Sequence, residues 1–335
     1  MSNATPAVRD LTVVVSCYNH QAFIEQCLDS IARQSVPVRQ VIVIDDASKD
    51  QSVDVIERWL ADHDLNWTFI KHEKNRGVCA TLNEAVELSE SSFFVHVSGD
   101  DWEPVDRFQR QADAFADLDD GIALLVGDLR EVDAGGGTIV EHDYSTRLGH
   151  VTGPENQSAL LQGLLAENVI PAPGTMIRTS AIREIGGFDE DLAFEDYDMW
   201  MRLASRYAIA YLPGIVANYR VVDSGLTRNV DRRVSVLTSE ADMLAKHIGS
   251  SPANDAIIAR RLLPIAGEIM LLGSVSGVRH VLGEAMAASP EPGIRTAYRD
   301  SRTRRGIERL VTTRAKEFGV KPPVAAASGK APRKR

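Results

Sequence analysis

The first hundred residues alternate short apolar runs with amphipathic stripes, and this alternation restricts the fold more than any other feature of the chain. The apolar runs predict strands at 11–16, 41–44, 67–70 and 93–97. Between the first two runs, Ile24, Cys27, Leu28 and Ile31 recur at helical spacing, and similar stripes fill the other two gaps. Because single helices between strands require crossover connections, we predict an α/β domain with a mainly parallel sheet flanked by helices.

Two pairs of aspartates stand at the ends of predicted strands. Asp45 and Asp46 follow the second strand directly, and Asp100 and Asp101 follow the fourth. Since ligands bind at the carboxyl ends of parallel strands, these carboxylates should share one edge of the sheet. Adjacent carboxylates suit a hard divalent cation that also binds a diphosphate. One pair alone is better explained as a turn or a helix cap, but two pairs at one edge favour a ligand site.

A third acidic cluster lies at the start of a helix predicted for residues 195–206. Four acids, Asp191, Glu195, Asp196 and Asp198, fall in this short stretch. Acids at the beginning of a helix interact favourably with its dipole, which is a purely structural role. Four acids are more than capping needs, and like charges this close raise one another's pKa. That effect suits a general base.

Several common catalytic motifs are absent from the sequence. No G-x-G-x-x-G follows the first strand, and the chain has no Walker A loop, no G-x-S-x-G and no H-E-x-x-H. Its eight histidines are scattered without ligand spacing. The three cysteines, Cys17, Cys27 and Cys79, fit neither a disulfide framework nor a zinc site, and we predict reduced thiols in a cytoplasmic protein.

Charge is distributed unevenly along the chain. The formal net charge is −10, yet the residues from Arg295 onward contain 13 Lys or Arg against three Asp or Glu. The acidic remainder argues against nucleic acid as a partner. The basic segment from Arg295 to Lys316 has two interpretations: peripheral contact with an anionic membrane at the inner face of the cell, or, more simply, a solvated face. No apolar run approaches the roughly 20 residues of a membrane span.

Apolar stripes beyond residue 230 predict a C-terminal helical extension. Val234, Leu237 and Ala241 belong to one stripe, and Ile258 and Leu262 to another. These helices could pack within the chain, which is the simpler interpretation, or form a homodimer. We divide the chain into a flexible N-terminus (1–9), an α/β domain (10–228), the helical region (229–318) and a disordered basic tail (319–335).

An ordered series of short motifs resembles the family-2 glycosyltransferases, which have the GT-A fold. Each motif is weak alone, but their order and spacing over residues 10–225 are specific. The motifs are VVVSCYN at 13–19, VIVIDDAS at 41–48, NRG at 75–77, SGDDW at 98–102 with Pro104, GGFD at 186–189, and Glu195-Asp196 with Trp200 and Arg202. The resemblance implies a Rossmann-like mixed sheet with a nucleotide-binding half (10–118) and an acceptor half (119–228).

The resemblance also implies a role for individual residues. The nucleotide would be held by Cys17, Tyr18, Asn19, Asp46, Asn75, Arg76, Gly77 and Asp100. Among these, Asp46 corresponds to the aspartate that binds a uracil-type base. Asp100 and Asp101 correspond to the D-x-D-like motif, which contacts the ribose and a Mg²⁺ or Mn²⁺ on the diphosphate. Asp196 corresponds to the catalytic base.

The implied activity is an inverting transfer of a sugar from a nucleotide-diphosphate donor, with a UDP-sugar as the first expectation. The acceptor would be a saccharide or a lipid-linked saccharide in the synthesis of a bacterial surface polysaccharide. Two departures from the family pattern, Ser98 and Val222, leave open a protein that binds the nucleotide or acceptor with little or no turnover. A sugar nucleotidyltransferase is a further alternative, although the glycine-rich phosphate loop of that class is missing after the first strand.

Overall fold

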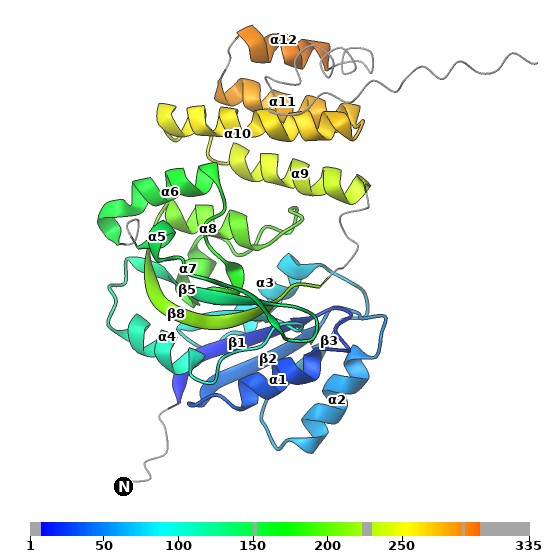
Figure 1. The fold of residues 1–335 in the computed structure, drawn as a ribbon, viewed down its shortest axis with the longest axis vertical. Coiled ribbons are helices and arrows are strands. Elements are labelled where there is room, and N and C mark those ends of the chain that lie inside the picture. Colours follow the sequence, from blue (N-terminus) through cyan, green and yellow to red (C-terminus); the bar gives the residue numbers. More distant parts are fainter. Residues whose placement is uncertain (1–7, 150–152, 223–229, 290–291, 302–335) are drawn as a thin grey trace, which may run out of the picture. The chain divides into compact units, whose positions relative to one another are not determined.

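The computed structural model describes residues 8–149, 153–222, 230–289 and 292–301. Its contacts divide the chain into two compact units, residues 1–224 and 225–335 (Figure 1). The boundary predicted at 228/229, most of the N-terminal segment 1–9 and the whole tail 319–335 lie outside the described residues. The same is true of residues 302–316 of the basic segment.

The first unit alternates strands and helices as predicted and then continues with further strands and helices, among them the helix predicted for residues 195–206. Its strands are β1 (Arg9–Cys17), β2 (Val38–Asp45), β3 (Thr68–Lys71), β4 (Phe93–Ser98), β5 (Ile122–Val132), β6 (Thr138–His142), β7 (Thr175–Arg178) and β8 (Ala208–Arg220). Its α-helices are α1 (Ile24–Ala32), α2 (Ser52–Asp62), α3 (Val78–Leu88), α4 (Arg107–Ala116), α5 (Ser145–Leu148), α6 (Gln157–Ala166), α7 (Thr179–Glu184) and α8 (Asp196–Ala204). Two short 3₁₀ turns are η1 (Pro154–Asn156) and η2 (Ala172–Gly174).

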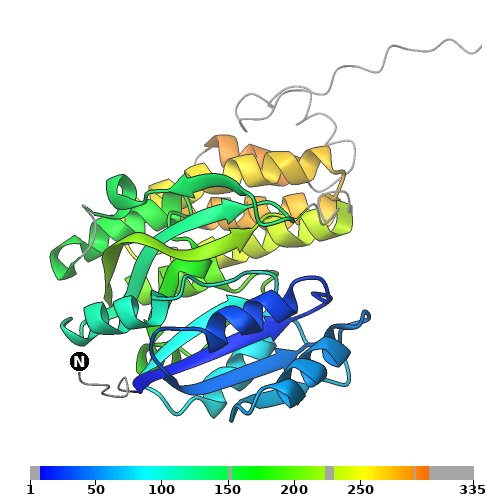
Figure 2. The same ribbon diagram turned by 60° about the horizontal axis from the view of Figure 1, so that its bottom comes forward.

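All eight strands form one mixed sheet in the order β3-β2-β1-β4-β7-β5-β6, with β8 paired to β5 (Figures 1 and 2). The β3-β2-β1-β4 half is entirely parallel. Strand β7 runs antiparallel to both of its neighbours, β4 and β5. The mainly parallel α/β prediction is therefore confirmed, and the carboxyl ends of β1, β2 and β4 share one edge.

Strand β1 lies at the centre of the parallel half and is covered on both faces. Leu11, Val13 and Val15 point into a core with α1, α2 and α4. On the other face Thr12 accepts a hydrogen bond from Ser89, which ends α3 (2.9 Å between hydroxyls). This two-sided burial explains the continuous β-branched run in the sequence.

Strand β8 runs through Pro213 and Gly214 without ending. Its pairing with β5 changes register next to Asp128. The Asp128 carboxylate accepts the Gly214 amide (2.8 Å) and the Tyr211 hydroxyl (2.7 Å), so the irregular backbone stays hydrogen-bonded. Gly214 has φ of +96°, which a residue with a side chain adopts at a cost.

The second unit is helical, as predicted. It consists of α9 (Val230–Ala245), α10 (Pro252–Leu271), α11 (Val275–Ala288) and α12 (Pro292–Asp300), and α9, α10 and α11 pack on one another. The hydroxyls of Ser251 and Ser274 accept the amides of Asn254 and Gly277 and so cap α10 and α11. In the part of the chain that the structure describes, no helix is long and apolar enough to cross a membrane. The homodimer, the membrane contact and the cytoplasmic location stay predictions.

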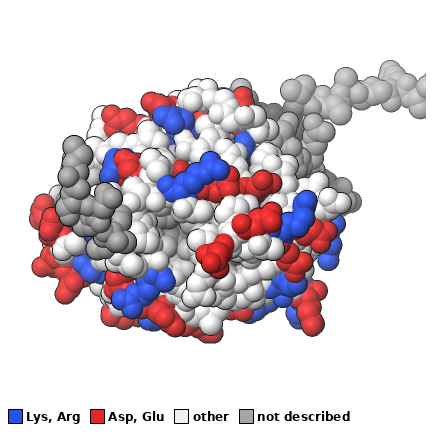
Figure 3. All heavy atoms as spheres, turned by 90° about the horizontal axis from the view of Figure 1, so that it is seen from below, with Lys and Arg blue, Asp and Glu red and all other residues white. Residues whose placement is uncertain are grey.

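Basic and acidic side chains are interspersed on the face of the molecule shown in Figure 3. Neighbouring charges of opposite sign largely cancel at the distance of a Debye length. This face therefore does not present the single-sign basic field that binding to a nucleic-acid backbone requires.

Candidate functional site

The loops that follow β1 and β2 are hydrogen-bonded to each other at the carboxyl edge of the sheet. The Asn19 amide donates to the Ser48 hydroxyl (2.9 Å), and the Lys49 amide donates to Oδ1 of Asn19 (2.7 Å). Asn19 has φ of +61°, a left-handed conformation that asparagine tolerates better than most residues. The two loops therefore form one rigid rim.

Cys17 and Tyr18, both expected at the nucleotide, occupy opposite environments. The Cys17 side chain is 1% exposed and packs in the core, and burial raises the pKa of its thiol to about 12. Its carbonyl accepts the Asp46 amide (2.9 Å), so Cys17 supports the rim rather than presenting a polar side chain. The Tyr18 side chain is exposed and is available to a ligand.

Asp46 is buried and organises the loop at 75–77. Its Oδ1 accepts the Arg76 amide (2.8 Å) and contacts Nδ1 of His72 (2.7 Å), and its Oδ2 accepts the Gly77 amide (2.8 Å). Asn75 donates to the Asp46 carbonyl (3.1 Å). The structure thus brings Asp46, Asn75, Arg76 and Gly77 together, as the sequence predicted.

Asp45 has a different role from its neighbour. Its carboxylate accepts the amide and the hydroxyl of Ser48 (2.8 and 2.6 Å), and the side chain is 1% exposed. This is the turn-forming role that the sequence left open for either aspartate.

The carboxylates of Asp100 and Asp101 repel each other at the end of β4. Asp101 is 3% exposed, and burial together with Asp100 raises the pKa of its carboxyl well above the usual range. One of its oxygens accepts the Arg220 amide (2.7 Å). Asp100 accepts the Ser98 hydroxyl (2.5 Å). A cation at this edge would relieve the repulsion between the two carboxylates.

Arg220, at the end of β8, fixes the backbone around this acidic pair. Its guanidinium lies between the rings of Phe23 and Trp102, with its carbon 4.4 and 4.6 Å from the ring centroids. It donates to the carbonyl of Asp100 (2.8 Å) and to Oε1 of Gln26 (2.7 Å). The same group donates to the carbonyls of residues 133 and 134 in the β5–β6 hairpin.

The segment that leads into α8 is docked on α3. The side chain of Asn83 accepts the Phe188 amide (2.8 Å) and donates to the Phe188 carbonyl (2.9 Å). The Cys79 thiol donates to the Phe194 carbonyl (3.7 Å). Gly187 has φ of +78°, and a Cβ on it would lie 2.6 Å from Oδ1 of Asn83, so both its conformation and its packing require glycine.

Glu195 and Asp196 stand where α8 begins. Burial and the charge of Asp196 raise the pKa of Glu195 to about 7, and burial also raises the pKa of Asp196. The side-chain nitrogen Nδ2 of Asn168 donates a long hydrogen bond to Oδ2 of Asp196 (3.4 Å). Two adjacent carboxyl groups with raised pKa values are suited to accepting a proton near neutral pH.

Two of the acidic groups act on the same side chain. Partial burial raises the pKa of Tyr219, and so do the charges of Asp101, Asp100, Glu131 and Asp196. Burial and then the charge of Glu195 raise the pKa of Cys79, two residues after the glycine whose amide donates to Asp46, to about 12. Asp100, Asp101 and Asp196, which are far apart in the sequence, therefore all lie within electrostatic range of Tyr219.

The acidic pair at Asp100-Asp101 fits a divalent cation only with help from a substrate. No three His, Cys, Asp or Glu side chains within the described ranges gather as a complete cation cage. Mg²⁺ is usually held by one or two carboxylates together with substrate phosphates and water, and two carboxylates are what this edge offers.

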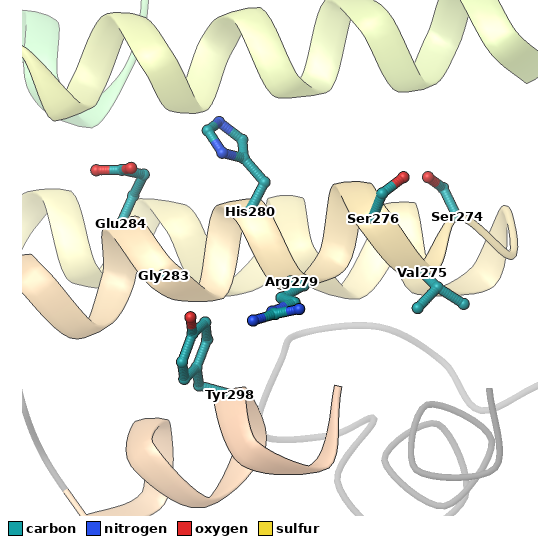
Figure 4. Close-up of a pocket in the computed structure, with 8 residues that line it drawn as sticks. All are labelled: Ser274, Val275, Ser276, Arg279, His280, Gly283, Glu284 and Tyr298. Atoms are coloured by element: carbon teal, nitrogen blue, oxygen red, sulfur yellow. The ribbon is translucent and has the colours of Figure 1, made fainter. Parts of the chain in front are cut away.

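A hollow of about 800 Å³ lies in the second unit, along α11. Its side chains diverge: His280 and Glu284 point to one side of α11, and Arg279 and Tyr298 lie on the other (Figure 4). His280 is already bonded to Asp242 (2.6 Å). This hollow lacks convergent polar groups, so the candidate site is the acidic edge of the first unit.

The model of the family described as Glycosyl transferase family 2 matches residues 12–186, just over half of the chain. The chain belongs to glycosyl transferase family 2. This glycosyl transferase family 2 chain is 24% identical over 209 residues to a poly-beta-1,6-N-acetyl-D-glucosamine synthase of Staphylococcus epidermidis, covering 62% of the chain and 48% of that protein. It is 33% identical over 98 residues to the putative glycosyltransferase EpsH of Bacillus subtilis, covering 29% and 27%. The chain thus spans half or less of the length of these curated relatives.

Solved structures share the fold of this family-2 chain. S. aureus TarS 1-349 in complex with UDP-GlcNAc has a TM-score of 0.65 at 19% identity, with 96% of this chain and 95% of that chain covered. The mannosyltransferase PcManGT from Pyrobaculum calidifontis, in complex with GDP-Man and Mn²⁺, has a TM-score of 0.53 at 19% identity, with 92% and 88% covered. The predicted GT-A fold is therefore confirmed.

The sequence did not reveal several residues of this site. His72 and Glu84 complete the surroundings of Asp46, and their only signal was proximity to the NRG motif. Asn168, beside Asp196, lies in a segment without any periodic pattern. Tyr219 and Arg220 are also part of this site, because β8 returns to the end of β4 and the Arg220 amide donates to Asp101.

Proposed function

We propose that this chain transfers a sugar, with inversion, from a nucleotide-diphosphate donor to a saccharide or lipid-linked acceptor. The observation that carries the proposal is that the Asp100-Asp101 pair and Asp196 act on the same side chain, Tyr219, while Asp46 follows β2 at the same carboxyl edge of the sheet. The relative that synthesises poly-beta-1,6-N-acetyl-D-glucosamine supports a setting in bacterial surface polysaccharide synthesis.

The contacts of Asp46 favour a nucleotide sugar whose base has an N–H group on the edge that faces this carboxylate. Its carboxylate accepts two backbone amides and contacts His72, which leaves one lone-pair direction of about four for a ligand. A carboxylate only accepts, so in a contact with N3 of the base it favours uracil, whose N3 carries a proton, over cytosine, whose N3 does not. The UDP-GlcNAc complex of a structural neighbour agrees with a UDP-sugar.

Asp100 and Asp101 would hold Mg²⁺ or Mn²⁺ against the diphosphate. A bound cation supplies positive charge that stabilises the departing nucleotide diphosphate. Arg220 keeps the backbone of this pair in place, so the carboxylates need not reorganise when a donor binds. Asp196 then takes the proton from the acceptor hydroxyl as that oxygen attacks the anomeric carbon, and one displacement inverts the configuration.

A donor panel tests the proposed function. Purified protein with Mn²⁺ and an acceptor mixture should release nucleotide diphosphate from one member of a panel of UDP-, GDP- and other nucleotide sugars, and EDTA should abolish the release. Binding of UDP without release from any donor would indicate a binding protein instead. Pyrophosphate released from a nucleoside triphosphate and a sugar phosphate would indicate a nucleotidyltransferase.

The rate should rise with pH across neutrality, because the general base must be ionised. Burial raises the pKa of both Glu195 and Asp196, and the pKa of Glu195 lies at about 7, so protonation of this pair at acid pH should lower the rate. Glu195→Gln removes the carboxyl group whose pKa lies at about 7 and should move the acid limb of the kcat profile to lower pH. An acid limb that stays in place in Glu195→Gln would contradict the coupling.

A further inference from the structure

His72 lies between two carboxylates, beside the loop that borders the proposed nucleotide pocket. It follows β3, and its side chain is 5% exposed. Nδ1 of the ring lies 2.7 Å from Oδ1 of Asp46, and Nε2 lies 3.0 Å from Oε2 of Glu84 in α3. The His72 amide donates to the Asp45 carbonyl (2.9 Å), so the backbone of His72 is fixed to the end of β2.

The partners of the His72 ring define its charge. A neutral imidazole has one N–H donor and one acceptor nitrogen, whereas an ionised carboxylate only accepts. Both ring nitrogens face carboxylate oxygens. Asp46 also accepts two backbone amides and Glu84 also accepts the Arg76 guanidinium, so both carboxylates are already committed as acceptors. An imidazolium donates to both carboxylates, whereas a neutral ring donates to only one of them.

These contacts form a chain of alternating charge from Asp46 through His72 and Glu84 to Arg76. The chain holds Arg76 at two points, because Asp46 accepts its amide and Glu84 accepts its guanidinium. The Arg76 side chain is 41% exposed, and an arginine so exposed would otherwise sample many rotamers. Lys71, the residue before His72, is paired with Glu57 (2.5 Å).

We infer that His72 is a positioning residue for the nucleotide: its imidazolium holds the Asp46 carboxylate and, through Glu84, the Arg76 guanidinium in the arrangement that receives the donor. This inference rests on the proposed function, since it assigns the role through the nucleotide pocket. It goes beyond the family motifs, because neither His72 nor Glu84 belongs to them.

Titration calorimetry with UDP and Mn²⁺ tests the inference. His72→Gln keeps a side chain of similar size but donates to only one carboxylate, and we expect UDP affinity to fall about tenfold, the typical effect of one charged hydrogen bond. Glu84→Gln changes a more exposed member of the Asp46–His72–Glu84–Arg76 series and should also lower UDP affinity. This variant replaces His72→Gln in the test if His72→Gln fails to fold. The matched control is His280→Gln, which breaks a similar His–Asp contact in the second unit and should leave UDP affinity unchanged.

A spectroscopic measurement separates charge from mere packing. The nitrogen-15 spectrum of the wild-type imidazoles at pH 7 should contain a ring protonated on both nitrogens, and His72→Gln should remove that signal. A neutral His72 ring, or wild-type UDP affinity in both His72→Gln and Glu84→Gln, would overturn the role of His72 while leaving the proposed function standing. Failure of the wild-type protein to bind UDP would instead remove the UDP pocket and this inference with it.

Discussion

Asp196→Asn should lower the turnover of a nucleotide sugar by about 10²- to 10⁴-fold while UDP affinity changes less than twofold. Asparagine keeps the size of the side chain and its position beside Asn168, but it cannot accept the proton of the acceptor hydroxyl. The expected loss is the typical contribution of a general base. Single-turnover release of UDP, together with calorimetric binding of UDP, separates the chemical step from binding.

Asp191→Asn is the matched control for this experiment. Asp191 belongs to the same acidic run but is exposed and precedes α8 by five residues, so its removal should leave turnover near the wild-type rate. Wild-type turnover in Asp196→Asn would refute the assignment of the base. A larger loss in Glu195→Gln than in Asp196→Asn would transfer that role to Glu195.

Arg107→Met should destabilise the first unit by about 3–5 kcal/mol, because it leaves a buried carboxylate without a cation. Arg107 is fully buried in α4 and pairs with Glu103 at 2.6 Å. It also donates to Gln111 and to the carbonyl of Thr175 (both 3.0 Å), which ties α4 to the start of β7. All four tryptophans lie in the first unit, so their fluorescence during urea unfolding reports on this unit.

Two further variants distinguish the effect of leaving Glu103 without a cation from the effect of losing an arginine side chain. Arg33→Met removes the cation of another i,i+4 ion pair, with Asp29, but Arg33 is 76% exposed and the expected loss is below about 1 kcal/mol. The double variant Arg107→Met/Glu103→Met removes both charges and should be more stable than Arg107→Met. Equal stability of the single and double variants would show that the isolated Glu103 charge is not the cause.

The parallel half of the sheet was predictable because its pattern is local. Strands β1, β2 and β4 are buried on both faces, so each reads as a continuous apolar run that ends in polar residues. The site residues at those ends followed from a general rule about parallel sheets rather than from any single motif. Asp46 and Asp101 are where that rule places them.

The pairings of β7, the register of β8 and the surroundings of the site were not predictable, because they depend on contacts between residues that are distant in the sequence. Strand β7 has only four residues, and its pairing with both β4 and β5 exists only in the folded chain. Strand β8 carries a register change that reads in sequence as a break at Pro213-Gly214. His72 meets Asp46 across 26 residues and Glu84 across 12, and neither separation is a helical or strand repeat.

The position of Arg220 has a mechanical consequence. Its guanidinium packs between the rings of Phe23 and Trp102 and donates hydrogen bonds to the turn of the β5–β6 hairpin and to the carbonyl of Asp100. A displacement of the hairpin would therefore also move the loop that contains Asp100 and Asp101. Substitutions in this hairpin should therefore also affect the proposed cation site at Asp100 and Asp101.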